Sequence, residues 1–475
     1  MRGTAAWVSA SCVAFAVGCG GNHGIPQGQE RGPCYSSGVC EPGLTCLSDL
    51  CVRLNADGGP DGNAGSGAGG AGGSGTAGGP GTGGSGTAGS GSGGSGTGGT
   101  FAVAPHAPLP QLANLGGPVM TAPKVLPLFF AGDSGQTDIT SFLSELAARS
   151  YWRATTSEYG VGALTVLPAV TGLTMTASSI DDSALQAAIA SNTASLSPPW
   201  GAPDPNTIYL FALPANVTLT AGGETCCTSF GGYHGETNAN GVEVPYVVAC
   251  ACPDFFGPGW DLVDERTVAM SHELVEAATD PFPAGDPAFY GADQANLVWT
   301  LATGGEVADM CVIQPDYATI PTGARYAVQK SWSNAAARAG GDPCVPAAPS
   351  PPYFNSMPAL AVIPYGPLGY KTHGVQIPVG TSRTIDLDLF SAGVVASNWN
   401  VAAYSYEDFF GGTPSLSFSL DRIAGHNGDV IRLTITALRT NGTFGVDPFI
   451  IVSSIGAPGD AGYRSHVTMG LVTND

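Results

Sequence analysis

The chain has 475 residues, which is enough for several domains. Aspartate and glutamate together number 37 against 16 lysines and arginines, so the formal net charge is −21. Binding to a nucleic-acid backbone needs clustered lysine and arginine side chains. The composition therefore argues against a nucleic-acid partner.

The N-terminus has the features of an export signal over residues 1–18. Arg2 precedes an apolar run over residues 5–17 that is too short for a permanent membrane span. The run ends in AVGC, which resembles a bacterial lipobox with Ala16 in place of the usual leucine. We therefore expect a lipid on Cys19 and an outer-membrane or cell-surface lipoprotein, anchored to the membrane by that lipid alone. Ordinary secretion is the alternative.

Two small segments follow the signal. Residues 19–53 contain Cys34, Cys40, Cys46 and Cys51, and a segment of this size needs disulfides to stabilise it because it cannot bury a core. Residues 54–100 are rich in glycine, serine and threonine. They lack the apolar side chains that would offset the entropy of ordering a backbone, so we expect a flexible tether.

Residues 101–350 carry both strand and helix patterns. Apolar runs at residues 124–130, 207–212 and 244–249 predict buried strands. Residues 138–150 have apolar side chains at helical spacing, with Asp138 as the expected N-cap. Strands and helices mixed over this length predict an α/β or α+β domain.

A further domain is expected over residues 351–475, after two consecutive prolines. Strand-like runs, some with strict alternation, occur at residues 384–389, 415–420, 430–436 and 449–452. This spacing predicts an all-β sandwich. No obvious catalytic cluster of side chains lies in this region.

The strongest chemical signal is the run SHELVEAATDP at residues 271–281. Asp264 is a candidate N-cap for the helix that contains it, and Pro281 ends the helix. His272 and Glu276 then lie one turn apart on the same face. This is the zincin H-E-x-x-H arrangement with glutamate in place of the second histidine, which predicts metal ligands at His272 and Glu276 and a general base at Glu273.

Catalytic zinc usually keeps three protein ligands, so a third is needed. Glu306 lies in the run GEVADMC. Its distance along the chain from Glu276 is similar to that of the glutamate ligand in gluzincins. Asp309 follows one turn later. Asp309 is either the ligand itself or a carboxylate that orients His272. Asp280 is a weaker candidate, and we expect it to be structural.

The region from residue 124 to residue 345 resembles the exordium, or phosphate-induced protein, family of plants and its bacterial relatives. The matching pieces are Gly231–His234, Ser271–Glu276, Glu306–Cys311, Trp332–Asn334, Cys344, Tyr151–Trp152 and Tyr159–Gly160. The resemblance implies a zincin-like central domain that acts as a metallopeptidase or as a cell-wall growth factor. The segments outside it resemble myxobacterial surface proteins in style.

In this resemblance, His234 closes a loop that contains cysteines. It is either a donor to a developing oxyanion, a fourth metal ligand, or a structural residue. Cys226, Cys227, Cys250 and Cys252 flank it and can fix the loop with two disulfides of undetermined pairing. A disulfide from Cys311 to Cys344 would then join the segment of the third ligand to the end of the domain.

The sequence thus leaves two hypotheses open. The first is an exported zinc-dependent peptidase that acts on a protein or peptide, with a metal-bound water that the two carboxylate ligands make less acidic. The second is a non-catalytic surface protein that a metal stabilises and that binds glycan or a cell-wall polymer. Calcium, which prefers oxygen ligands, is the less favoured ion.

Overall fold

The computed structural model describes residues 101–474, apart from residues 175–178, 195–197, 256–259, 366–369, 441–445, 459 and 461. It also describes the backbone of strands β1 (Thr45–Leu47) and β2 (Leu50–Val52), which places Cys46 opposite Cys51. The predicted signal, Cys19, Cys34, Cys40 and the tether lie outside the described residues.

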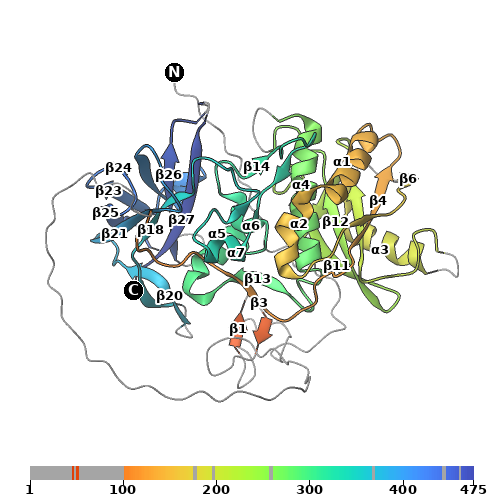
Figure 1. The fold of residues 1–475 in the computed structure, drawn as a ribbon. Coiled ribbons are helices and arrows are strands. Elements are labelled where there is room, and N and C mark those ends of the chain that lie inside the picture. Colours follow the sequence, from red (N-terminus) through yellow and green to blue (C-terminus); the bar gives the residue numbers. More distant parts are fainter. Residues whose placement is uncertain are drawn as a thin grey trace, which may run out of the picture.

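The centre of the protein is a mainly parallel sheet with the strand order β11-β12-β8-β4-β5, in which β6 also pairs with β4 (Figure 1). Its strands are β4 (Lys124–Phe130), β5 (Thr165–Val166), β6 (Val170–Leu173), β8 (Thr207–Ala212), β11 (Gly232–Ala239) and β12 (Val242–Ala249). The edge strand β11 is antiparallel to β12, whereas the other pairs are parallel. The three strands predicted from apolar runs are β4, β8 and β12.

Helices cover both faces of this sheet. Successive side chains of a strand point to opposite faces, and both sets of β4 side chains are apolar and pack against helices. Val125 and Phe129 of β4 join one hydrophobic core, which also contains side chains of α1 (Gln136–Ala148), α2 (Ser150–Thr156) and α4 (Leu262–Thr279). Leu126 and Leu128 join a second core with α3 (Asp182–Thr193). The prediction of a mixed α/β domain is confirmed.

Two predicted helix starts are wrong by about one turn. Helix α1 is preceded by Gly135, and Asp138 lies in its first turn instead of capping it. In α4 the N-cap is Asp261, whose side chain accepts a hydrogen bond from the backbone N–H of Asp264. Both helices nevertheless have an acidic residue where the helix dipole favours one.

The remaining elements between residues 101 and 350 are short. They are η1 (Ser157–Tyr159), β3 (Leu112–Asn114), β7 (Ser179–Asp181), β9 (Thr218–Ala221), β10 (Glu224–Thr225), β13 (Phe289–Ala292), η2 (Gln294–Asn296), α5 (Leu297–Thr303), α6 (Asp309–Val312), β14 (Ala318–Thr319), β15 (Val328–Gln329), β16 (Ser331–Trp332), α7 (Asn334–Arg338) and β17 (Cys344–Val345). The Cys311–Cys344 disulfide joins α6 to β17.

The C-terminal region is β-rich, as predicted, and contains two sheets that share a hydrophobic core. One has the order β18-β21-β25-β23 and the other β19-β20-β27-β26-β22-β24. Their elements are β18 (Phe354–Pro358), β19 (Ala361–Tyr365), β20 (Tyr370–Gln376), β21 (Ser382–Ser391), β22 (Trp399–Ser405), α8 (Tyr406–Phe409), β23 (Leu416–Leu420), β24 (Ala424–Gly425), β25 (Val430–Ala437), β26 (Asp447–Ile455) and β27 (Arg464–Thr473). Leu387 and Leu433 of the first sheet and Trp399 and Phe449 of the second are fully buried in the shared core.

The C-terminal sheets pack against the segment that follows α4. Val467 and Leu471 of β27 belong to the same hydrophobic core as the central sheet. The backbone N–H of Val467 donates to Oε1 of Gln314 at 2.9 Å, and the hydroxyl of Tyr406 donates to the carbonyl of Ala302 at 3.1 Å. Helices α5 and α6 accordingly lie between the two β-rich parts (Figure 1).

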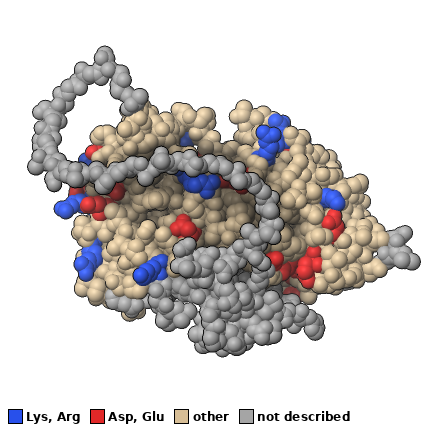
Figure 2. Space-filling model, turned by 60° about the horizontal axis from the view of Figure 1, so that its bottom comes forward, with Lys and Arg blue, Asp and Glu red and all other residues tan. Residues whose placement is uncertain are grey.

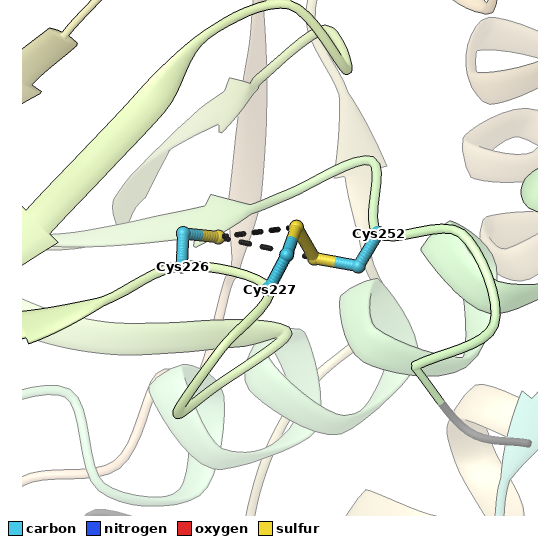
Figure 3. Close-up of side chains that lie close together, drawn as sticks. All are labelled: Cys226, Cys227 and Cys252. Atoms are coloured by element: carbon cyan, nitrogen blue, oxygen red, sulfur yellow. Dashed lines mark hydrogen bonds between the residues drawn. A yellow bond between two sulfur atoms is a disulfide. The ribbon is translucent and has the colours of Figure 1, made fainter.

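Two disulfides hold the start of β11, and the structure gives the pairing that the sequence left open. Cys226 is joined to Cys250 and Cys227 to Cys252. Figure 3 shows Cys226 beside the Cys227–Cys252 disulfide. In the part of the chain that the structure describes, every helix is too short or too polar to span a membrane.

A buried ion pair fixes the N-terminal half of α4 to the turn after β4. The two terminal nitrogens of the Arg266 guanidinium, Nη1 and Nη2, donate to the Asp133 carboxylate at 3.1 and 3.0 Å, and each side chain is 3% exposed. We expect Arg266→Met to destabilise the protein by about 3–5 kcal/mol, because it leaves a buried charge without compensation. The measurement is the unfolding midpoint in urea, followed by circular dichroism.

The matched control is the double variant Arg266→Met/Asp133→Asn. It removes both charges. In the wild type the N–H of Gly135 donates a hydrogen bond to Asp133, and the asparagine that replaces it keeps a side-chain oxygen that can accept this bond. The double variant should recover most of the lost stability. Equal losses in the single and double variants would contradict the account.

Candidate metal centre

Helix α4 carries the H-E-x-x-E motif in a buried position. Every side chain from Glu265 to Thr279 is buried, and the helix packs against β11, β12 and β15. Nε2 of His272 lies 3.0 Å from Oε2 of Glu276, and the two side chains are 11% and 2% exposed. A solvated helix face, the ordinary explanation for such acidic residues, is therefore excluded.

Gln329 of β15 sets the orientation of the His272 ring. Nδ1 of His272 lies 2.9 Å from Oε1 of Gln329, while Nε2 of Gln329 donates to the carbonyl oxygen of Ala308 at 2.9 Å. This second bond assigns the amide oxygen to the His272 side, so Nδ1 of His272 carries the proton. Once a metal displaces the second proton, Nε2 has a lone pair, the form in which histidine binds a metal.

The backbone of the segment that follows Glu306 fixes Glu276. Oε1 of Glu276 accepts hydrogen bonds from the N–H groups of Ala308 and Asp309, at 3.1 and 3.0 Å. Oε2 is consequently turned towards the histidines. Oδ1 of Asp309 lies 3.5 Å from Nε2 of His272, so His272, Glu276 and Asp309 form one group of potential ligands.

His234 lies on the edge strand β11 and not in a loop, which corrects the expectation from sequence. Its side chain is 4% exposed and points into the cluster. Nδ1 lies 3.5 Å from Oε2 of Glu273 and 3.7 Å from Oε2 of Glu276, and Nε2 lies 3.4 Å from Oε1 of Glu306. His234, Glu276 and Glu306 thus form a second group of potential ligands.

Glu273 lies between the two histidines. Its Oε1 is 4.0 Å from Nε2 of His272 and its Oε2 is 3.5 Å from Nδ1 of His234. The absence of a side chain at Gly232 makes room for it, because a Cβ there would lie 3.1 Å from Cγ of Glu273. The structure therefore brings together all six residues that the sequence proposed for the site, including both Glu306 and Asp309.

The electrostatics of the cluster favour cations. Burial lowers the pKa of His234 and His272, but nearby carboxylates, chiefly Glu306 for His234 and Glu276 for His272, raise each pKa well above its usual range. Burial also raises the pKa of Glu276. The folded, metal-free site holds protons that the unfolded chain would release, so its contribution to stability is lost as the pH rises through the raised pKa values. A metal ion must displace these protons on binding.

Two more carboxylates lie near the cluster: Asp280, the weaker candidate from sequence, and Glu236, which the sequence did not suggest. Asp280, expected to be structural, accepts a hydrogen bond from the N–H of Ala288 through Oδ1, whereas its buried Oδ2 has no hydrogen-bond partner. Glu236 lies two residues after His234 on β11, and burial raises the pKa of its carboxyl to about 7. Sequence reasoning missed Glu236 and Gln329, because neither belongs to a ligand motif.

A third group of possible metal ligands is excluded by its chemistry. The sulfur atoms of Cys226, Cys227 and Cys252 lie within 4.8 Å of one another (Figure 3). All three cysteines are in disulfides, and a metal needs the thiolate form.

On the face shown in Figure 2, lysine and arginine side chains are scattered and form no continuous patch.

Neither a family model nor a curated protein matches this sequence. A solved structure, described as "Crystal structure of the S-layer protein SbsC domains 4 and 5", is similar at 17% sequence identity over 25% of this chain. The matched part spans 46% of that structure, with a TM-score of 0.15, which is too low to support an argument about fold or function. The resemblance to the exordium family stays a prediction.

The Gln329 amide gives a test of the site that does not require activity. We expect Gln329→Leu to weaken zinc binding by about 10–100-fold, because the His272 ring loses the acceptor that fixes its tautomer. Competition with a chromophoric chelator measures the Kd. An unchanged Kd in a folded Gln329→Leu protein would contradict the role of Gln329 in orienting His272.

Proposed function

We propose that this protein is an exported, surface-anchored zinc-dependent peptidase that uses the H-E-x-x-E motif of α4. The observation that carries the proposal is the His272–Glu276 pair. One imidazole nitrogen and one carboxylate oxygen lie 3.0 Å apart in a buried position, close to the spacing of adjacent ligands around zinc. Imidazole ligands favour zinc over calcium, which prefers an all-oxygen site.

The second group of potential ligands, beside the one at His272, also supports metal binding in this cluster. Nε2 of His234 and Oε1 of Glu306 are buried and have no hydrogen-bond partner. Buried polar groups without a partner are costly, and coordination to a metal would satisfy them. His272, Glu276 and Asp309 would hold a zinc ion, which supplies an electrophile for a carbonyl oxygen and lowers the pKa of a bound water.

Glu273 is the proposed general base. Its carboxylate lies beside the side chains that would hold the metal, 4.0 Å from Nε2 of His272. From there it would take a proton from the attacking water and deliver it to the leaving nitrogen. The Glu273 side chain is 9% exposed, so few solvent molecules can stabilise its charge in place of the attacking water.

The architecture supports a peptide as the substrate, and the zincin-like assignment belongs to this proposal. The motif helix packs against the edge strand β11, which is antiparallel to its neighbour β12. Among the described residues, β11 pairs with a strand on one side only. An extended peptide adds readily to such an edge through backbone hydrogen bonds, which would place its carbonyl groups beside His234.

Export is supported by the disulfides. The described part of the chain contains Cys226–Cys250, Cys227–Cys252 and Cys311–Cys344, and disulfides persist in oxidising compartments. The surface anchor at Cys19 and the tether are proposals from sequence alone.

One observation favours the second candidate function, a surface protein that is merely stabilised by metal. The ligand side chains are largely buried, with Glu306 the most exposed at 15% and Glu276 at 2%. A structural metal site is closed, whereas a catalytic site keeps an open position for water. The effect of replacing the motif glutamate Glu273 on proteolysis separates the two functions.

We expect Glu273→Gln to retain its metal and to lose proteolysis by about 100-fold or more, because the amide cannot accept the proton. Casein cleavage by the full chain, with and without chelator, is measured beside the zinc content. The exposed Glu243→Gln is the matched control and should cleave like wild type. Equal cleavage by Glu273→Gln would reject this base, and a metal-loaded, inactive wild type would favour the non-catalytic function.

A further inference from the structure

The Glu276 carboxylate is placed to serve two groups of ligands at once. Its Oε1 is occupied by the N–H groups of Ala308 and Asp309. Its Oε2 faces Nε2 of His272 at 3.0 Å and Nδ1 of His234 at 3.7 Å, so imidazoles approach it from two different elements. A carboxylate that is fixed in this way cannot turn to satisfy one histidine at the expense of the other.

The ligands form two triplets and not a single cage. In His272, Glu276 and Asp309 the ligand atoms lie within 4.8 Å of one another, and the same holds for His234, Glu276 and Glu306. Glu276 is the one residue that both triplets contain. Adjacent ligands of a single tetrahedral zinc ion lie about 3.4 Å apart, at bond lengths of about 2.0–2.2 Å, so each triplet has the dimensions of a separate site.

The second triplet has its own sign of a missing ligand. The His234 side chain is only 4% exposed, and its Nε2 has no hydrogen-bond partner. Oε1 of Glu306, 3.4 Å away, is buried and has none either. The two atoms form only a long ion pair with each other, and a shared cation would bind both of them.

The charge of the cluster points the same way. Glu273, Glu276, Glu306 and Asp309 together carry four negative charges when ionised. In the described part of the chain, the ion pairs of the three glutamates are with the two histidines and not with lysine or arginine. Buried carboxylates without compensation are costly. One divalent ion offsets half of this charge, and two offset all of it.

We infer that the cluster is a dinuclear centre, in which His234, Glu276 and Glu306 bind a second divalent transition-metal ion. Glu276 bridges this ion to the one at His272 and Asp309. The inference rests on the metal binding in the proposed function but not on catalysis. In known two-metal sites the ions lie about 3.5–4 Å apart and hold an oxygen-rich group of the substrate between them.

Metal stoichiometry tests the inference directly. The full chain is stripped with chelator, re-equilibrated with zinc, passed through a desalting column and analysed for zinc and protein by mass spectrometry. We expect two ions per chain in wild type and in the control Glu243→Gln. Glu306→Gln and Asp309→Asn should each retain one, and Glu276→Gln should fall below one.

A wild type that holds one ion overturns the inference, whether Glu306→Gln keeps that ion or loses it. Two ions without proteolysis would instead contradict the peptidase proposal and leave the dinuclear centre standing. If Glu306→Gln does not fold, electron paramagnetic resonance of the manganese-loaded wild type decides. A spin-coupled pair supports the carboxylate bridge, and the spectrum of isolated manganese ions contradicts it.

Discussion

The hydrogen bonds from the N–H groups of Ala308 and Asp309 to Oε1 of Glu276 are the constraint on which the site depends. They join the motif helix to a segment that lies 32 residues further along the chain. The same contact turns the second oxygen of Glu276 towards both histidines and brings Asp309 to His272. Without it, the helix would present His272 and Glu276 but no third ligand.

The C-terminal region supports this contact from both sides. Tyr406 bonds to the carbonyl of Ala302, before the segment, and Val467 bonds to Gln314, after it. The Cys311–Cys344 disulfide adds a covalent restraint within the same stretch. A β-rich region without an obvious catalytic cluster of its own thereby positions Glu306 and Asp309. This role does not depend on whether it also binds a surface polymer.

Sequence reasoning found the parts of the site that have a periodic pattern. The apolar spacing predicted β4 and β8, and the motif predicted the one-turn separation of His272 and Glu276. Strand β11 was missed, because its sequence GYHGETNA has no apolar alternation: among its side chains only Tyr233 and Ala239 reach a hydrophobic core, whereas His234 faces the polar cluster. Strand β27 was also missed, since nine of its ten residues are buried and no alternation remains.

Other features of the site depend on tertiary contacts that no local pattern encodes. The choice between Glu306 and Asp309 could not be made from spacing, because both side chains reach the cluster and each meets a different histidine. Gln329 orients His272 from a distance of 57 residues. The start of α4 was misplaced because Asp261 and Asp264 are equally good caps by type, and only the backbone geometry selects between them. The start of α1 was misplaced because the helix begins after Gly135, which provides no side-chain cap.

The central claim is that α4 holds a metal ion, and anomalous diffraction at the zinc edge from crystals of the zinc-loaded protein tests it most directly. The account predicts an anomalous peak that contacts both Nε2 of His272 and Oε2 of Glu276, with an oxygen of Asp309 completing the protein ligands. A zinc-loaded protein without a peak at this position, with His272 and Glu276 in direct contact, would contradict it.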